Sequence, residues 1–164
     1  MEKINQIEID SPDVGRHYSF IYCIYFLHDE GVVYIGETNA QNGPLGRLSG
    51  HMQRETGTFY KRCLEKASID IDKIDDTIHM LTFNLQDYPV FCGDANKSNR
   101  LALEYFVHTK MEEYSVDDQT ATPFNVISHV SIASRNVTNK EFQYTAEIIA
   151  RSFYEMMPFA LVTQ

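Results

Sequence analysis

The feature that most constrains the fold is a nearly unbroken apolar run over residues 20–27, which reads Phe-Ile-Tyr-Cys-Ile-Tyr-Phe-Leu. Aromatic and β-branched residues favour strands, so this run predicts a buried β-strand. Residues 28–31, His-Asp-Glu-Gly, have turn chemistry, and Val-Val-Tyr-Ile-Gly at 32–36 has the composition of a second strand. The sequence therefore predicts an antiparallel hairpin near the start of the chain.

Apolar spacing and turn signals predict a series of short elements after this hairpin. In order along the chain, these are a helix over residues 47–55 after a polar loop at 38–46, a second helix capped by Thr58, a strand over 77–85, a helix over 96–113, and a final helix from the Thr138-x-x-Glu141 capping box to about residue 157. The fold class expected is α+β: a small central antiparallel sheet of about three strands, flanked by helices, with an added C-terminal helix.

The size of the chain predicts one compact unit. It has 164 residues without repeats, low-complexity tracts or a Pro/Gly-rich linker. We divide it into an N-terminal lead-in at 1–17, a main domain at 18–128, and a helical extension at 129–164 that packs on the same domain. The longest apolar stretch is too short to span a membrane, and the three cysteines are widely spaced. We expect a soluble, cytoplasmic protein with reduced thiols.

Charge is segregated along the chain. The formal net charge is −9, which argues against a broad basic surface for nucleic acid. Residues 47–66 nevertheless carry five basic side chains against two acidic ones, and residues 67–94 carry six aspartates against one lysine. A nucleic-acid contact would therefore have to be local to the basic segment.

Two pairs of residues have side chains suited to phosphate chemistry. The hairpin puts Tyr25 and Tyr34 on adjacent strands. Gly36 comes two residues after Tyr34, and a glycine at a strand end lets another backbone or a ligand approach closely. Arg47 and His51 are four residues apart, so a helix would present both on one face. Arginine can bind two phosphate oxygens, while histidine exchanges protons near neutral pH. The alternative for the two tyrosines is a role in core packing. The alternative for Arg47 and His51 is that they lie on a solvent-exposed helix face.

The helix expected over residues 96–113 contains a polar stripe. Between positions 100 and 108 only Arg100, Glu104 and His108 are not apolar, and they recur every four residues. A carboxylate in such a helix needs a partner or a metal ion, because burying it alone is costly. An ion pair between Arg100 and Glu104 at helical spacing is one interpretation, and a metal ligand is the other.

Together these segments resemble the GIY-YIG nuclease family over about residues 19–128. Cys23-Ile24-Tyr25 stands where the family has Gly-Ile-Tyr, and Tyr34-Ile35-Gly36 is its second motif. Arg47, His51, Glu104 and Asn125 then follow in the family order. A competing alignment uses Phe20-Ile21-Tyr22 as the first motif. We favour Tyr25, and since the two tyrosines would face opposite sides of a strand, only one can serve.

The resemblance implies a stand-alone endonuclease that hydrolyses phosphodiesters, most simply in DNA, with Mg²⁺ or Mn²⁺. It implies Glu104 as the single protein ligand of the metal, Arg47 as the phosphate clamp, and Tyr25 as general base assisted by His51 or Tyr34. The expected supporting residues are Gly36, Thr38 as a loop or phosphate contact, Arg100 orienting Glu104, and Asn125 near the site or in an Asx turn.

Other functions remain open. An acidic chain favours a catalytically inactive member of the same fold that binds nucleic acid or protein, and RNA is a further substrate class. No zinc-finger spacing or basic tail is present, so specificity would come from loops, from a homodimer or from a partner subunit.

Overall fold

A computed structural model describes residues 7–116, 122–130 and 138–159 of the chain. Its strands are β1 (Phe20–Leu27), β2 (Gly31–Thr38), β3 (His79–Asn84) and β4 (Phe124–Val126). Its α-helices are α1 (Gly43–His51), α2 (Thr58–Ala67), α3 (Lys97–Ser115) and α4 (Lys140–Met156). Short 3-10 helices lie at η1 (Pro12–Gly15), η2 (Ile71–Lys73), η3 (Pro89–Phe91) and η4 (Asp94–Asn96).

The expected α+β class with a C-terminal helix is confirmed, and the hairpin of β1 and β2 forms where the sequence predicted it. The sheet differs from the prediction because the described residues form four strands in the order β3-β1-β2-β4. β1 pairs antiparallel with β2 and β3, whereas β4 runs parallel to β2. The sheet is therefore mixed. Within the part of the chain that the structure describes, β4 pairs with Gly31–Val33 and the second half of β2 has no strand neighbour on that side.

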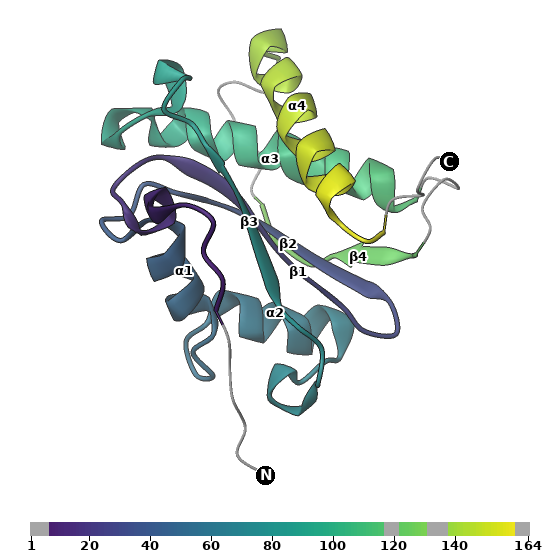
Figure 1. Cartoon of the computed structure of the whole chain (residues 1–164). Helices are drawn as coiled ribbons and strands as arrows, with labels where there is room; N and C mark the ends of the chain where they lie inside the picture. The colour runs from purple at the N-terminus through teal and green to yellow at the C-terminus, as the bar shows by residue number, and fades with distance from the viewer. Residues whose placement is uncertain (1–6, 117–121, 131–137, 160–164) are drawn as a thin grey trace.

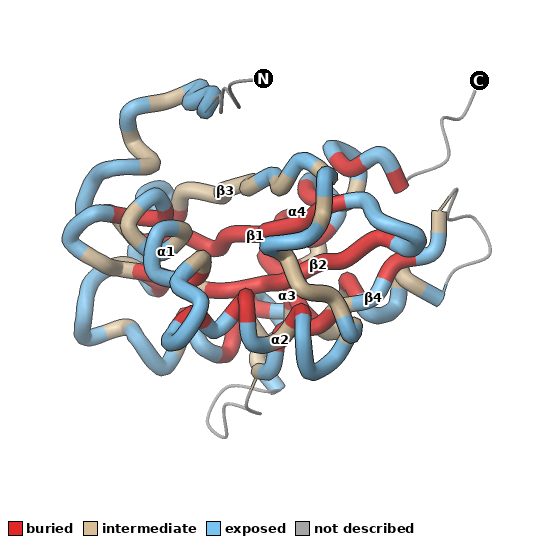
Figure 2. Tube along the Cα trace, turned by 90° about the horizontal axis from the view of Figure 1, so that it is seen from below, coloured by how far each residue is buried: buried red, intermediate tan, exposed pale blue. Residues whose placement is uncertain are grey.

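Helices cover both faces of the sheet, with α3 and α4 on one side and α1 and α2 on the other (Figure 1). Side chains of β1 alternate between these two layers. Ile21, Cys23 and Tyr25 join the hydrophobic cluster of α3 and α4, while Tyr22 and Ile24 join the cluster of α2. Figure 2 shows β1 and β2 buried along most of their length between the helices. The hairpin is thus the centre of the core.

Three helix starts differ from those predicted. α1 begins at Gly43 rather than residue 47, with a proline in its first turn, where a missing N–H costs nothing. Thr58 is the first residue of α2 and does not cap it. The cap of α4 is Asn139, whose side-chain oxygen accepts from the backbone N–H groups of the next turn, so the Thr138 capping-box prediction is wrong. Of these three helices, α4 alone has a side-chain N-cap hydrogen bond.

The C-terminal helix completes the core. Its expected apolar face, Phe142, Ala146, Ile149 and Phe153, is buried in one cluster with residues of β1 and α3. This agrees with the prediction that α4 packs within the core. Phe159 beyond the helix is also fully buried.

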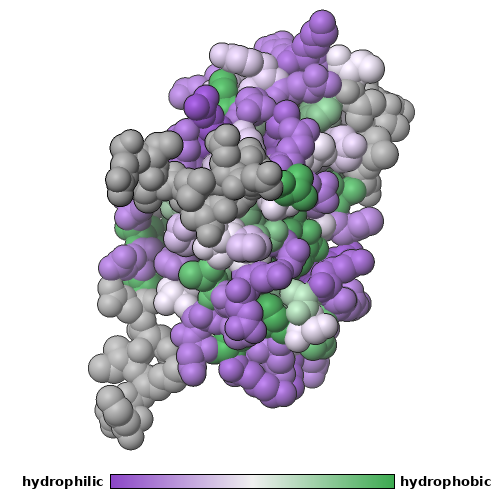
Figure 3. All heavy atoms as spheres, turned by 90° about the vertical axis from the view of Figure 1, so that its right-hand side faces the viewer, coloured by the Kyte–Doolittle hydropathy of each residue, from purple (hydrophilic) through white to green (hydrophobic). Residues whose placement is uncertain are grey.

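The described surface is largely polar. Figure 3 shows hydrophilic side chains over most of the face seen from the right of Figure 1, with hydrophobic ones scattered in small groups. Among residues 7–116, 122–130 and 138–159, no helix has the length and apolar character needed to cross a membrane.

Candidate active site

Tyr22 of β1, Tyr34 of β2 and His51 of α1 meet on the face of the sheet that α1 and α2 cover. The Tyr22 hydroxyl lies 2.7 Å from Nε2 of His51. The His51 ring also packs edge-on against Tyr34, with centroids 5.0 Å apart. All three residues are less than a tenth exposed. The hairpin and the end of α1 therefore hold two tyrosines around one buried imidazole.

Gly36 makes room for this arrangement. It is the cross-strand neighbour of Tyr22, and a Cβ atom at Gly36 would lie 2.2 Å from the Tyr22 ring. No side chain fits at that distance. The glycine of the Tyr-Ile-Gly motif is thus explained by the ring that crosses it, and this links Gly36 to Tyr22 rather than to Tyr25.

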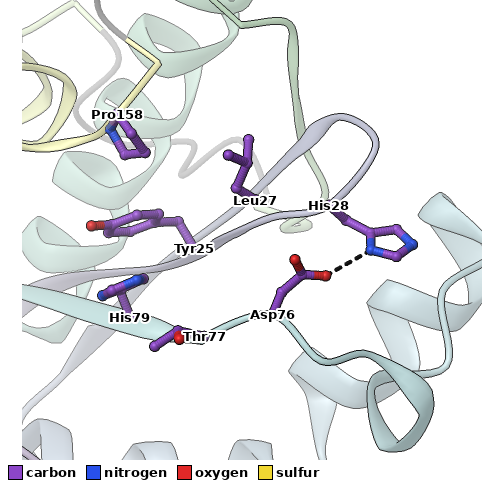
Figure 4. Close-up of a pocket in the computed structure, with 7 residues that line it drawn as sticks. All are labelled: Tyr25, Leu27, His28, Asp76, Thr77, His79 and Pro158. Carbon is purple, nitrogen blue, oxygen red and sulfur yellow. Dashed lines mark hydrogen bonds and ion pairs between the residues drawn. The ribbon is translucent and has the colours of Figure 1, made fainter.

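The expectation that Tyr25 joins these residues is wrong. Because Tyr25 is three positions from Tyr22, it points to the opposite face of the sheet. Its ring stacks on His79 at 4.9 Å and contacts Phe159 edge-on. Figure 4 shows it beside an open cavity of about 330 Å³, with the His28–Asp76 pair at the far side. The competing register, Phe20-Ile21-Tyr22, is the one that the geometry brings together with Tyr34 and His51.

Arg47 lies one helical turn before His51, as its four-residue spacing predicted. Its guanidinium interacts electrostatically with Tyr22, Tyr34 and Glu37. No acidic side chain of the described residues forms an ion pair with it within 4.0 Å. Arg47 therefore has donors available for an anion beside the two tyrosines.

Glu104 reaches the same group from α3. Its charge interacts with Tyr22 and Tyr34 although α3 covers the other face of the sheet. Glu104 can reach them because β4 does not pair with this part of the β2 edge. The backbone N–H of Ile35, which points away from β1, donates to the Ser128 hydroxyl instead. The next outward amide, that of Glu37, interacts with the Glu104 carboxylate.

The surroundings of Glu104 disfavour its negative charge. Burial raises the pKa of its carboxyl to about 8, with a second contribution from the nearby charge of Glu37. The Glu37 amide and Arg47 oppose this rise. A carboxylate in this position gains more from a nearby cation than an exposed one does.

Arg100 does not form the ion pair with Glu104 that was one of the two interpretations of their helical spacing. Its Nε donates to Oε2 of Glu37 at 2.7 Å, and its NH1 donates to the backbone carbonyls of Phe91 and Gly93. Arg100 is almost fully buried, and Glu37 is largely buried. Arg100 therefore pairs with a carboxylate that is distant in sequence and not with the one a helical turn away. Arg100 consequently fixes the end of β2, whose Glu37 amide contacts Glu104.

The Tyr22–His51 pair is neutral at neutral pH. Burial, reinforced by the charge of Arg47, lowers the pKa of His51 to about 4. Burial is the main reason why the pKa of Tyr22 is raised well above its ordinary value, and the nearby Tyr34 adds to this rise. The positive charge of Arg47 opposes it. When the imidazole carries its proton on Nδ1, the Tyr22 hydroxyl donates to Nε2. The hydrogen bond is then a ready path for a proton from the tyrosine to the histidine.

Two supporting residues named from the sequence make structural contacts, and for Thr38 these agree with the loop role that was one of its two interpretations. Asn125 is in β4 and donates to Glu30 of the hairpin turn at 2.7 Å, so its expected place near the site is wrong. Thr38 is the buried last residue of β2, and its hydroxyl accepts from the Ala40 N–H. This hydrogen bond is part of a local turn, and the buried hydroxyl of Thr38 is not an exposed phosphate ligand.

Sequence reasoning missed Glu37 and Arg62. Glu37 directly follows the Tyr-Ile-Gly motif, and a charged residue at the end of a buried strand is a signal that could have been used. Arg62 of α2 lowers the pKa of Tyr34, whose overall pKa is raised to about 12 chiefly by burial. Its membership of the basic segment was visible, but its proximity to Tyr34 depends on how α2 packs.

The residues fit only a lightly coordinated metal ion. Among residues 7–116, 122–130 and 138–159, no group of three or more histidine, cysteine or acidic side chains could hold a metal. Glu104, with Glu37 nearby, offers the hard oxygen donors that suit a cation such as Mg²⁺, which retains most of its water. A site in which protein side chains surround the metal is not supported.

Comparison with known proteins adds no relative. No family model matches the sequence, and no curated protein or solved structure matches it significantly. The fold class and the geometry of the site are therefore the basis for assigning a function.

Proposed function

We propose that the protein is a divalent-metal-dependent endonuclease that hydrolyses phosphodiester bonds, with DNA as its substrate. The observation that carries the proposal is the Tyr22–His51 hydrogen bond of 2.7 Å beside Arg47 and Glu104. It combines a proton path, a guanidinium with available donors and a buried carboxylate. These are the groups that phosphodiester hydrolysis requires.

The resemblance to GIY-YIG nucleases supports the same proposal in the corrected register. Phe20-Ile21-Tyr22 then replaces the first motif, and Tyr34-Ile35-Gly36 supplies the second. Five motif residues, Tyr22, Tyr34, Arg47, His51 and Glu104, interact with one another in the fold. Membership of that family is part of the proposal.

Each side chain has a role in the proposed hydrolysis. Arg47 binds the phosphate that is attacked. Burial is the main cause of the low pKa of His51, and the bound anion offsets the second cause, the positive charge of Arg47. A water oxygen attacks phosphorus, the bond to the leaving oxygen breaks, and the proton of the water passes to Tyr22 as the tyrosine's own proton moves to Nε2 of His51. The leaving oxygen takes a proton from solvent water, and His51 returns its extra proton to solvent. This relay avoids a free tyrosinate, which the raised pKa of Tyr22 disfavours.

Glu104 would hold the cation, either Mg²⁺ or Mn²⁺. When bound, the cation supplies positive charge to the phosphate and to the leaving oxygen. Glu37 and Arg100 keep the end of β2 in place beside this carboxylate.

Glu104→Gln is the central test. We expect supercoiled plasmid to be nicked in the presence of Mg²⁺ or Mn²⁺, and the variant to lose about 100-fold or more of that rate, because an amide cannot replace a carboxylate toward a cation. Glu113→Gln, at an exposed position of the same helix, is the matched control and should cut normally. Equal inactivity of all three proteins on DNA and RNA with either metal would remove the nuclease proposal.

A catalytically inactive binding module is the second candidate. The net charge of −9, and the lack of three metal-ligating side chains in one place among the described residues, favour it. The discriminating result would be DNA or protein binding without cleavage.

If the protein acts as a homodimer, light scattering of the purified chain should give twice its 18.9 kDa mass. If it acts with a partner subunit, the same measurement should give a mixed complex when that subunit is added.

A further inference from the structure

A polar groove lies next to the candidate site. It runs between α2, α3 and the segment that follows β4, and it encloses a cavity of about 480 Å³. The polar and aromatic side chains that line it include Lys66, Tyr105, His108, Glu112, Ser128 and His129.

The α3 wall continues the polar stripe of the site. Glu104, His108 and Glu112 recur every four residues, so they follow one face of the helix at steps of slightly more than one turn, or about 6 Å. His108 is held in place because its Nε2 is 3.0 Å from the Ser128 carbonyl oxygen. The groove therefore begins about one turn beyond the proposed metal ligand.

The α2 wall is basic. Arg62 and Lys66 are also four residues apart, so they share a face of α2. Arg62 interacts electrostatically with Tyr34 of the site, and Lys66 lines the groove. Lys66 is exposed and has no ion pair within 4.0 Å among the described side chains. Arg62 also pairs with Glu65 at 3.9 Å, so Lys66 is the positive charge that α2 contributes to the described lining of the groove.

Flat rings complete the groove. Tyr105 follows Glu104 directly and is partly exposed, and His129 is exposed beyond β4. Aromatic rings bind nucleobases by stacking, and a basic wall binds the phosphate that links them. Glu112 is the one acidic residue among the described residues of the lining, and its carboxylate lies 3.6 Å from Nδ1 of His108.

We propose that this groove binds one unpaired nucleotide of a DNA strand, next to the phosphodiester that the site cuts. The proposal rests on the proposed nuclease function and names its substrate class: DNA with a single-stranded flap, a bulge or an extruded base. A base within a duplex is stacked and paired, so it can occupy a pocket only when it leaves the stack. Lys66 contacts the phosphate and Tyr105 stacks on the base.

Binding is tested without cleavage, using the full-length Glu104→Gln chain with Mg²⁺. Fluorescence anisotropy compares a labelled duplex with the same duplex carrying a short 3′ or 5′ single-stranded flap. We expect the flap substrate to bind at least about tenfold more tightly, and Tyr105→Leu to remove about tenfold of that affinity, the effect typical of one stacked base. Lys66→Gln should weaken binding and reduce its salt dependence, whereas Glu112→Gln should strengthen it.

The matched controls are Tyr144→Leu and Lys140→Gln, at exposed positions of α4. Both should bind like the parent. Equal affinity for duplex and flap, or groove variants that bind like the controls, would overturn the groove assignment. Tighter binding of an RNA strand of the same sequence would overturn DNA as the substrate class.

This assay also separates the two proposals. If the wild-type protein cuts DNA but shows no preference for unpaired nucleotides, the groove assignment fails while the nuclease proposal stands. If the preference is present and depends on Tyr105 while no substrate is cut, the groove assignment stands and the binding-module function replaces the nuclease.

Discussion

The two faces of the β1–β2 hairpin each pair a tyrosine of β1 with a histidine, yet their surroundings differ. On the α1–α2 face, the Tyr22 hydroxyl contacts Nε2 of His51 at 2.7 Å, and Arg47 and Glu104 interact with the tyrosine. On the α3–α4 face, Tyr25 stacks on the ring of His79. The cavity beside it has neither arginine nor lysine among its described lining residues.

The difference shows that a pair of side chains alone does not make a site. Both pairs have the same chemical groups, but only the Tyr22–His51 pair is enclosed and has both a guanidinium and a carboxylate nearby. Burial shifts the pKa values of both members of that pair. Three predictions test this contrast, in order of decreasing expected effect.

Gly36→Ala should disturb the Tyr22 face most strongly. The added methyl would collide with the Tyr22 ring, and overpacking of this kind costs about 3 kcal/mol of unfolding free energy. Urea denaturation measures it. Gly50→Ala, where nothing lies within 4 Å of the new atom, is the control and should be neutral or stabilising by up to about 1 kcal/mol. Equal stability of the two variants would contradict the close packing of Tyr22 on Gly36.

His51 should make stability depend on pH. Its folded pKa of about 4 lies below the ordinary value of 6.5, so the unfolded chain binds the extra proton first as pH falls. The contribution of His51 is therefore retained above pH 6.5 and lost between pH 6.5 and 4, by about 3 kcal/mol in total. Glu104 has the opposite sign: its pKa is raised to about 8, so it destabilises the fold as pH rises from 4.5 to 8.

The two effects are separated by a variant. The unfolding free energy of wild type minus that of His51→Gln, measured by urea denaturation, should fall by about 3 kcal/mol from pH 7 to pH 4. The Glu104 contribution cancels in this difference. His79→Gln gives the baseline for losing an imidazole from the other face. A difference independent of pH would show that His51 is not held neutral by the fold.

Tyr22→Phe and Tyr25→Phe give the smallest effect but the most direct comparison. Loss of the Tyr22 hydroxyl leaves Nε2 of His51 without its partner, which costs about 1–2 kcal/mol. Cleavage should fall by about tenfold or more if Tyr22 relays the proton. Tyr25→Phe should change stability by less than about 0.5 kcal/mol and leave cleavage intact. The reverse pattern would restore Tyr25 as the motif residue.

Much of the fold follows from local sequence. The run of aromatic and β-branched residues at 20–27, with a turn at 28–31, specifies the hairpin because strand preference and turn chemistry agree there. The apolar spacing of α4 specified its buried face in the same way. β4 was not predicted as a strand because three residues carry too little periodicity, and its parallel partner lies some 90 positions earlier.

The candidate site was only partly determined by sequence. The four-residue spacing placed Arg47 beside His51, since a helix alone fixes that relation. The same spacing did not pair Arg100 with Glu104, because the fold brings Glu37, 63 positions away in sequence, within hydrogen-bond distance of Arg100. Asn125 was also misplaced, as the parallel pairing of β4 directs it to the hairpin turn.

The sequence by itself determined that Tyr22 and Tyr25 lie on opposite faces of β1, because side chains alternate along any strand. Only the tertiary structure decided which face carries the site. α1 crosses one side of the sheet and brings Arg47 and His51 to Tyr22, and the short β4 leaves the edge of β2 open to Glu104. That choice depends on the packing of distant elements, which no local pattern in the chain encodes.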